Sequence, residues 1–257
     1  MNYISGSGGF IGSHLQKRIK ATPIPHTELS TITLEPFENF YFLSSYGNMA
    51  THKEDLDIYQ ANVIDLVHIL SESMKSRFKS FVYISTSSVK LRTQTMYSRS
   101  KRAAEETLLS FMEKYNRPIC IIRPFSVTGV GEQKEHLIPT LIRSCMTGEL
   151  VNFVPEPTHD YIDVDDVVEG IINLSSRGSR GIFELGTGKS CTNAQVLELV
   201  EKATGKKANI NIVSSMRSYD NDNWVSLNFR SRGWGWLPKK SLEQSIVEMV
   251  KDYEQTT

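Results

Sequence analysis

A cluster of glycines near the amino terminus constrains the fold of this chain more than any other feature. The segment GSGGFIG at residues 6–12 holds four glycines, although glycine inside a helix or strand costs roughly 0.5–1 kcal/mol relative to alanine. Residues 2–5 before it predict a short strand, and residues 10–19 have the apolar spacing of a helix. A strand, a glycine turn and a helix start together point backbone N–H groups and the positive end of the helix dipole outward. The segment therefore predicts a phosphate or dinucleotide site, with a flexible loop as the alternative, and its spacing Gly6-x-x-Gly9-x-x-Gly12 departs from the common G-x-G-x-x-G.

Short apolar runs alternate with helical patterns through the first half of the chain. We expect strands at residues 21–26, 40–43, 81–84 and 119–122, and helices at residues 56–78 and 97–115. This alternation indicates β-α units and a parallel sheet, which binds ligands beyond the carboxyl ends of its strands. The predicted fold class is α/β, a Rossmann-type doubly wound parallel sheet with a smaller mixed α/β substrate region at the carboxyl-terminal end.

The alternation loosens after residue 129. We expect helices at residues 137–146, 163–174, 194–203 and 241–253, and strands at residues 150–154 and 181–185. Thr192 is the expected cap of the helix that follows it. The predicted organisation is a dinucleotide-binding domain at residues 1–128, joined by about 161–186, and a substrate-binding region at residues 129–160 and 187–257.

Composition and charge exclude several classes of function. Lys plus Arg equals Asp plus Glu, 29 each, so no basic excess points to a nucleic acid or a membrane surface. No apolar run reaches the roughly 18 residues of a transmembrane helix, and the amino terminus lacks the pattern of a signal peptide. The three cysteines are far apart and suit a reducing compartment, so we predict a cytoplasmic protein. The six histidines show no metal-ligand spacing, and we expect no metal site.

A tyrosine and a lysine form a second constellation. Tyr97 and Lys101 are four residues apart and share one face of the predicted helix at residues 97–115. The expected strand before this helix ends in four hydroxyl residues, Ser85 to Ser88, for which a solvated loop is the alternative interpretation. A nearby ammonium and a cationic nicotinamide ring would lower the tyrosine pKa from its ordinary value of about 10. These groups together suit proton removal from an alcohol coupled to hydride transfer.

Several ordered motifs extend these two features along nearly the whole chain. They are GSGGFIGSHL, FVYISTSSV, YSRSK, IIRPFSVTGVG, HDYIDVDDVVEGI, FELGTGKS and GWGWLPKKSLEQSI. With them the sequence resembles the extended short-chain dehydrogenase/reductase family, in particular its NAD-dependent epimerase/dehydratase group, which acts on nucleotide sugars. The resemblance implies an NAD or NADP cofactor, a nucleotide-sugar substrate and a homodimer formed by the helices at residues 56–78 and 97–115.

The resemblance, together with the expected strand ends, gives three sets of site residues. Tyr97 would be the acid/base, Lys101 its cationic partner and Thr86 the third catalytic hydroxyl. The predicted cofactor-binding residues are Gly6, Gly9, Phe10, Ile11, Gly12, His26, Leu43, Ser44, Ser45, Asn62, Ser85, Tyr97, Lys101, Pro124 and Phe125. The predicted substrate-binding residues are Ser87, Ser126, His136, Leu137 and His159.

The chain also departs from the family pattern. The distance from Leu15 to Tyr41 is short enough that one strand-helix unit is missing. No acidic residue ends the expected strand at residues 21–26, where His26 or Thr27 stands in place of a ribose-binding carboxylate, so the choice between NAD and NADP stays open. Lys90 replaces a tyrosine, Ser126 replaces an asparagine, and His159 replaces an arginine that commonly meets the substrate diphosphate.

Three functions fit these observations. The leading hypothesis is a nucleotide-sugar epimerase that transiently oxidises and then re-reduces a sugar carbon. The second is an NADPH-dependent reductase of a keto-sugar or another carbonyl, and the third is a dinucleotide-binding protein without catalysis. A 4,6-dehydratase is disfavoured because Ser87 and Ser88 occupy the positions of the acid/base pair that such chemistry needs.

Overall fold

A six-stranded parallel sheet forms the centre of the larger lobe in the computed structural model, which describes residues 1–48, 55–214 and 224–256. Its strands are β1 (Asn2–Ser5), β2 (Thr22–Ile24), β3 (Asn39–Phe42), β4 (Ser80–Ile84), β5 (Ile119–Pro124) and β10 (Gly181–Leu185). They lie in the order β10-β5-β4-β3-β1-β2. β3 and β4 are buried along their whole lengths, as expected for strands covered on both faces. The predicted α/β doubly wound fold is confirmed.

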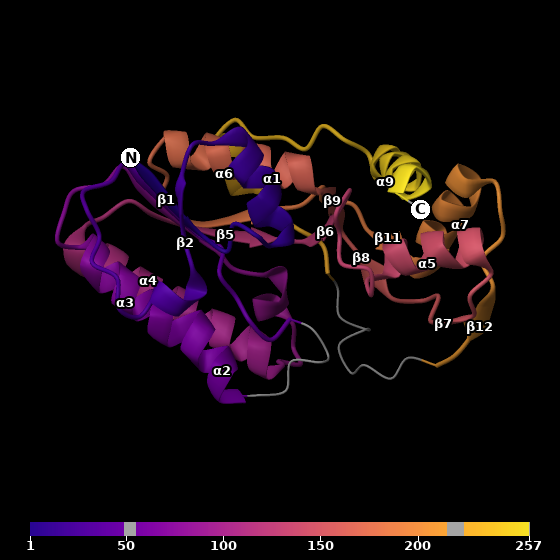
Figure 1. Ribbon diagram of the computed structural model, residues 1–257, viewed down its shortest axis with the longest axis horizontal. Helices are drawn as coiled ribbons and strands as arrows, with labels where there is room; N and C mark the ends of the chain where they lie inside the picture. Colours follow the sequence, from indigo (N-terminus) through magenta and orange to yellow (C-terminus); the bar gives the residue numbers. More distant parts are fainter. Residues whose placement is uncertain (49–54, 215–223, 257) are drawn as a thin grey trace.

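Helices cover both faces of this sheet. One face packs Phe42 and Phe81 against Leu66 and Leu108 of the helices α3 (Asp65–Ser73) and α4 (Met96–Tyr115). The other face packs its apolar side chains against α6 (Val164–Ser176), which lies beside α1 (Phe10–Arg18) (Figure 1). Asp163 caps α6 by accepting a hydrogen bond from the Asp165 N–H at 2.8 Å.

The connection from β2 to β3 contains one short 3₁₀ turn, η1 (His26–Glu28), among its regular elements. The expected loss of one strand-helix unit therefore has a direct structural counterpart. β2 and β3 flank β1 on opposite sides, so the chain reverses its direction of winding at β1. Ligands of doubly wound sheets bind in the crevice at such a switch point, beyond the carboxyl ends of the strands.

The predicted single helix at residues 56–78 is wrong in detail. The structure has α2 (Asp55–Tyr59), then a π-helical turn η2 (Gln60–Ile64), then α3, which ends at Ser73. A pattern of apolar residues three and four positions apart does not reveal the one extra residue that a π turn inserts into a helix. Such turns are frequent at functional sites, and this one carries Asn62.

A smaller lobe forms around three helices with their own core. Ile138, Leu141, Val196 and Ile246 pack together from α5 (Leu137–Thr147), α7 (Asn193–Thr204) and α9 (Leu242–Thr256). Two two-stranded sheets complete this half: β7 (Val151–Phe153) with β12 (Ile210–Ile212), and β8 (Thr158–His159) with β11 (Cys191–Thr192). A third, β6 (Ser126–Thr128) with β9 (Tyr161–Asp163), packs against α6 of the larger lobe. The short helix α8 (Phe229–Gly233) packs against β10.

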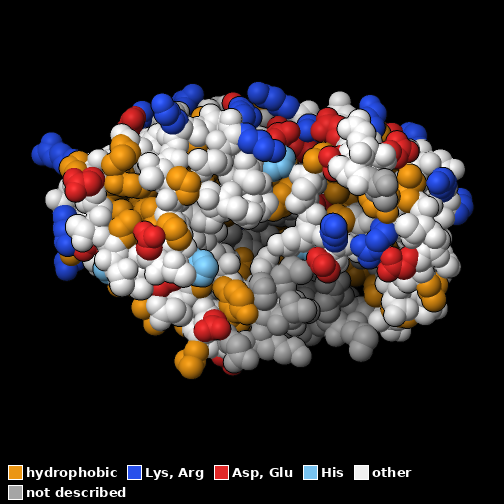
Figure 2. Space-filling model, in the orientation of Figure 1, with side chains coloured by type: hydrophobic (Ala, Val, Ile, Leu, Met, Phe, Trp, Pro, Cys, Tyr) orange, Lys and Arg blue, Asp and Glu red, His pale blue; other side chains and the backbone are white. Residues whose placement is uncertain are grey.

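The expected cap at Thr192 is confirmed. The Thr192 hydroxyl accepts from the Gln195 N–H at 3.1 Å, and the Gln195 side chain accepts from the Thr192 N–H at 2.8 Å, which makes a capping box. None of the helices within residues 1–48, 55–214 and 224–256 is long and apolar enough to cross a membrane. The space-filling view shows a hollow between the two lobes (Figure 2).

Candidate active site

The glycine turn between β1 and α1 has no room for side chains at two of its positions. Gly6 has φ +72°, and a Cβ there would lie 2.7 Å from both the Leu43 carbonyl carbon and the Ser44 nitrogen. A Cβ on Gly12 would lie 2.0 Å from the Gly6 carbonyl oxygen. α1 begins after Gly9, which supplies no side-chain cap, so its first-turn N–H groups keep their outward direction. This turn fits the pyrophosphate of a dinucleotide, because backbone and helix dipole meet a ligand without intervening side chains.

The segment after β3 lies directly against this turn. Leu43 and Ser44 supply the backbone atoms that approach Gly6, and the Ser44 N–H is 3.4 Å from the Ser5 hydroxyl. Ser45 follows and is exposed. The structure therefore places the predicted cofactor residues of β1 and β3 at one carboxyl edge of the sheet.

The side chain of Asn62 fixes the segment after β3 through hydrogen bonds. Its side-chain amide is fully buried, accepts from the Tyr46 N–H at 3.0 Å and donates to the Tyr46 carbonyl at 2.8 Å. It also donates to the Ser100 hydroxyl on α4 at 2.9 Å. Because both ends of the amide are engaged by the protein, Asn62 acts on the site by fixing the loop after β3 to α4.

Tyr97 lies in the first turn of α4, whose N-cap Thr95 accepts from the Ser98 N–H at 3.2 Å. Burial raises the pKa of the Tyr97 phenol above its ordinary value of 10, and a hydrogen bond with Ser45 opposes that rise. Sequence reasoning assigned the lowering of this pKa to Lys101, whereas within the described residues the opposing group is Ser45.

Lys101 is buried one helical turn after Tyr97, with 1% of its surface exposed. Its ammonium donates to the Ile84 carbonyl at 2.7 Å and lies 4.2 Å from the centre of the Tyr83 ring. Burial lowers the pKa of Lys101 to about 7, and the negative charge of Glu105 opposes this effect. The charge of Lys101 thus changes near neutral pH, which is a common property of lysines in functional sites.

Replacing Lys101 with methionine tests the cost of this burial. Because the folded pKa of about 7 lies below the ordinary 10.5, the unfolded chain binds more protons between these values. Wild-type stability should therefore rise with pH above 7, and the cost of the buried ammonium is fully present below pH 7. The free energy of unfolding of K101M minus that of wild type should therefore be larger at pH 6 than at pH 9, by on the order of 2 kcal/mol. Urea unfolding at both pH values measures this, with K114M at an exposed position of α4 as the control; a difference independent of pH contradicts the prediction.

The hydroxyl residues after β4 have separate partners. Thr86 is half-buried and caps the 3₁₀ turn η3 (Ser87–Lys90), accepting from the Ser88 N–H at 3.2 Å. Ser85 is buried and donates to Glu105 at 2.5 Å, so its hydroxyl is held by the protein. Pro124 and Phe125 are buried at the end of β5.

Lys90, which stands in place of a tyrosine of the family pattern, forms an ion pair beside these residues. The Lys90 ammonium is 2.6 Å from a carboxylate oxygen of Glu184 on β10 and lies 5.6 Å from the centre of the Phe125 ring. The pair joins η3 to the edge strand of the sheet.

A pair of aromatic rings connects the two lobes. The indole N–H of Trp224 donates to the Ser87 hydroxyl at 2.7 Å, and its ring centre lies 5.0 Å from that of His159. Two predicted substrate residues, Ser87 and His159, are thereby brought together by a tryptophan that sequence reasoning missed. Trp224 stands in a polar stretch without periodicity, so no local pattern could have singled it out.

Asp160 holds this bridge in place. The Asp160 N–H donates to the Trp224 carbonyl, and its buried carboxylate accepts from the main chain of Thr187, Gly188 and Ser226 at 2.7 to 3.0 Å. The Thr187 hydroxyl also donates to it at 2.6 Å. The turn after β10 and the segment of Trp224 are thus tied to a single side chain.

The other predicted residues lie farther along the two lobes. The Ser126 N–H donates to the Asp160 carbonyl at 3.0 Å. His136 stands at the N-cap position of α5 without a capping side-chain hydrogen bond, and its ring lies 3.0 Å from Glu132. Leu137 begins that helix and packs against the core of the smaller lobe. His26 is exposed after β2, on the opposite side of β1 from Ser45.

Fold and site together define a Rossmann-type α/β protein with a glycine turn and a Tyr–Lys helix at its switch point. The model of the NAD dependent epimerase/dehydratase family matches residues 40–186, and the chain belongs to that family. The matched range begins at β3, after the shortened connection from β2.

Individual relatives are distant. The chain is 24% identical over 222 residues to human dTDP-D-glucose 4,6-dehydratase, covering 76% of this chain and 62% of that protein. It is 27% identical over 253 residues to UDP-glucose 4-epimerase of Yersinia enterocolitica, covering 83% and 73% of the two chains. The chain therefore spans less than two thirds of the length of the human relative.

Solved structures share the fold over the whole chain. UDP-glucose 4-epimerase of Thermotoga maritima, solved with UDP-glucose, superposes with a TM-score of 0.88 at 21% identity, covering 100% of this chain and 99% of that one. UDP-N-acetylglucosamine 4-epimerase of Methanobrevibacter ruminantium, solved in complex with UDP-N-acetylmuramic acid, superposes at 0.89 with 18% identity, covering 100% and 98%.

Proposed function

We propose that this protein is an NAD(P)-dependent nucleotide-sugar epimerase. The observation that carries the proposal is that the glycine turn lies against Leu43 and Ser44, while Asn62 ties the loop after Ser44 to α4, the helix that carries Tyr97. Family membership supports it, and the relatives named above include UDP-sugar 4-epimerases.

The dinucleotide, when bound, accepts a hydride from the sugar carbon and returns it to the opposite face of the keto-sugar. Gly6, Gly9, Gly12 and the start of α1 would hold its pyrophosphate, and the segment after β3 would border the dinucleotide. Pro124 and Phe125 are buried at the end of β5, where they would keep water from the nicotinamide ring.

Tyr97 moves the proton. Its phenolic oxygen takes the proton of the sugar hydroxyl during oxidation and gives it back during reduction. Thr86 offers a hydroxyl at the end of β4 that would hold the same sugar oxygen. Lys101, one helical turn after Tyr97, is its proposed cationic partner. Trp224 and His159 close the site from the smaller lobe, where they would border the sugar nucleotide.

A net reductase using NADPH is the second candidate. One observation favours it, because the residue at the end of β2 is the exposed His26 and no carboxylate stands there to bind a ribose diol. The same Tyr97 and Lys101 would serve, with the hydride retained in the product.

The test is incubation of the purified protein with UDP- and dTDP-hexoses and either dinucleotide. Epimerisation gives a stereoisomer of the substrate with no net change in nicotinamide absorbance, whereas reduction of a keto-sugar consumes NADPH in proportion to product. Absence of any product with either dinucleotide, together with absence of bound dinucleotide in the purified protein, would overturn both candidates and leave a non-catalytic role.

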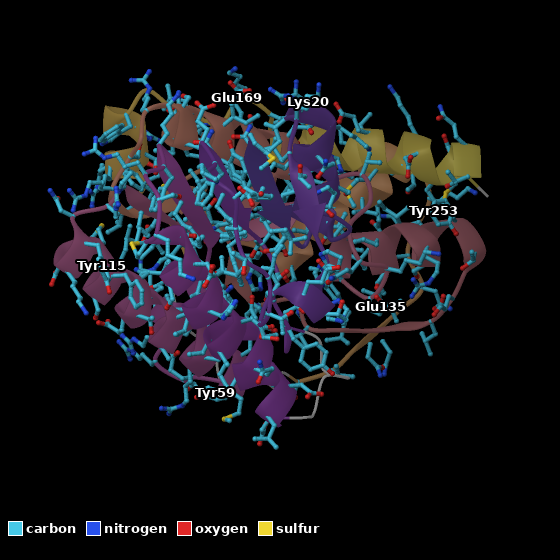
Figure 3. All side chains as sticks on the ribbon, turned by 60° about the vertical axis from the view of Figure 1, so that its left-hand side comes forward. Lys20, Tyr59, Tyr115, Glu135, Glu169 and Tyr253 are labelled. Carbon is cyan, nitrogen blue, oxygen red and sulfur yellow. The ribbon has the colours of Figure 1, made fainter. Side chains whose placement is uncertain are left out.

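We also propose a homodimer formed by α2, α3 and α4. Leu56 and Ile64 are 86% and 53% exposed on this helical layer, and Val67 and Tyr115 are also exposed. Tyr59 and Tyr115 lie along its outer side (Figure 3). Sedimentation analysis at several concentrations measures the assembly, and a monomer at all of them would refute it.

The compartment and the division of the chain remain predictions. Cys120, Cys145 and Cys191 are all free, which supports a reducing, cytoplasmic compartment. The division into a dinucleotide-binding part at residues 1–128 and 161–186 and a substrate part at residues 129–160 and 187–257 includes residues 49–54, 215–223 and 257, which lie outside the described residues.

A further inference from the structure

A buried carboxylate stands behind the Tyr–Lys pair. Glu105 is 2% exposed and follows Lys101 by one turn of α4 and Tyr97 by two turns. Residues at this spacing share one face of a helix, so the three side chains form a single row. Burying a carboxylate is costly unless it is paired, and this raises the question of what the charge does there.

Glu105 contacts two strands of the sheet at once. One of its oxygens accepts from the Ser85 hydroxyl at 2.5 Å and from Arg123 Nε at 2.9 Å, and the other accepts from a terminal Arg123 nitrogen at 2.5 Å. Ser85 precedes Thr86 at the end of β4, and Arg123 precedes Pro124 at the end of β5. Three elements that carry proposed site residues are thereby joined through one carboxylate.

The charges around Lys101 point to a second role. The ammonium faces the Tyr83 ring and the Ile84 carbonyl of β4, and Tyr97 precedes it on α4. Glu105 supplies the negative charge that favours the ammonium against the cost of burial, and the same carboxylate is paired with Arg123 of β5. The same carboxylate therefore serves both as a mechanical link and as the counter-charge of the lysine.

We propose that Glu105 is a positioning residue that fixes the Tyr97–Lys101 face of α4 to the ends of β4 and β5 and keeps the Lys101 ammonium charged. The inference rests on the proposed roles of Tyr97 and Lys101. A buried ion pair that served stability alone would hold the strands, and its removal as a pair would leave kcat unchanged.

The first experiment follows Lys101 directly, in protein without cofactor. The ε-carbon of ¹³C-labelled lysine is titrated by NMR in wild type, E105Q and E106Q, with K101M to assign the signal. Glu106 is the matched control, because it is exposed on the same helix and loses the same charge. We expect a midpoint near pH 7 in wild type and E106Q, and a midpoint lower by about one pH unit in E105Q. An unchanged midpoint in E105Q overturns the charge role.

The second experiment separates geometry from folding. E105Q leaves the Arg123 guanidinium without its counterion, so the double variant E105Q/R123M removes both charges and is followed by urea unfolding. We expect the double variant to recover stability relative to E105Q, to keep the lowered Lys101 midpoint, and to lose about 10²-fold in kcat with less than a threefold change in KM. Wild-type kcat in the double variant overturns the positioning role.

The conservative variant E105D adds a third comparison. It keeps the charge but withdraws the carboxylate by one methylene, so we expect the Lys101 midpoint to stay near that of wild type while kcat falls. If the midpoint shifts in E105Q and wild type has no activity on sugar nucleotides, the proposed function fails and the charge role of Glu105 stands. If wild type is active and the midpoint does not move in E105Q, the proposed function stands and the charge role of Glu105 fails.

Discussion

Replacement of Tyr97 by phenylalanine is expected to lower the rate of epimerisation by roughly 10²- to 10⁴-fold, the usual contribution of a general acid/base. The change removes the phenolic oxygen, which is the atom that meets Ser45, and leaves the ring in the first turn of α4. The fold and the affinity for the dinucleotide should therefore stay near those of wild type. Circular dichroism, dinucleotide binding and a product assay with UDP-hexoses measure these three quantities.

Tyr115 provides the control for this substitution. It lies at the opposite end of α4 and is 41% exposed, so Y115F removes the same atom from the same helix without touching the site. We expect Y115F to retain wild-type kcat. Epimerisation by Y97F at more than a tenth of the wild-type rate would mean that another group moves the proton, and the assignment of Tyr97 would then be abandoned.

The fold was predictable where burial is reflected in local sequence. β1 at Asn2–Ser5 and β10 at Gly181–Leu185 coincide with the predicted strands, and the boundaries of α7 and α9 differ from prediction by a few residues at most. Strands buried on both faces appear as continuous apolar runs, and amphipathic helices repeat every three or four residues. The fold class and the family are confirmed for this reason.

The two-residue strands of the smaller lobe could not be predicted. β8 and β11 pair residues 158–159 with residues 191–192, and a two-residue strand has too few positions to show an alternation. Their register comes instead from contacts such as those of Asp160, which joins residues 60 or more positions apart in one of its hydrogen bonds.

The same limit applies to the site. The glycine turn, Tyr97 and Lys101 stand in short local patterns, so their residue types and spacing were visible in the sequence. Glu105 and Trp224 were missed because their partners, Arg123 and Ser87, are separated from them by 18 and 137 residues. A charged residue at helical spacing ordinarily predicts a solvated face, and only tertiary packing turns Glu105 inward.

Alanine at Gly12 is expected to damage both stability and dinucleotide binding. Its Cβ would lie 2.0 Å from the Gly6 carbonyl oxygen, which is backbone and cannot swing aside, so the turn between β1 and α1 must shift. We expect a loss of unfolding free energy of about 3 kcal/mol or more and a loss of measurable NADH binding. Urea unfolding and NADH fluorescence titration measure the two effects, and wild-type stability in G12A would contradict the geometry of the turn.

Substitutions at two neighbouring glycines distinguish an effect on the stability of the fold from an effect on dinucleotide binding. A Cβ on Gly8 would meet nothing within 4 Å, so G8A should match wild type in stability and in binding. A Cβ on Gly9 would lie 3.4 Å from the Gly6 oxygen, and Gly9 has ordinary φ and ψ of −76° and 173°, so the folded chain tolerates alanine there. If a pyrophosphate approaches the start of α1, G9A should weaken NADH binding at least about tenfold, or ~1.4 kcal/mol, at unchanged stability. Equal NADH affinity in G9A and wild type would mean that the glycine spacing serves the packing of β1 against α1 and that the dinucleotide, if bound, lies elsewhere.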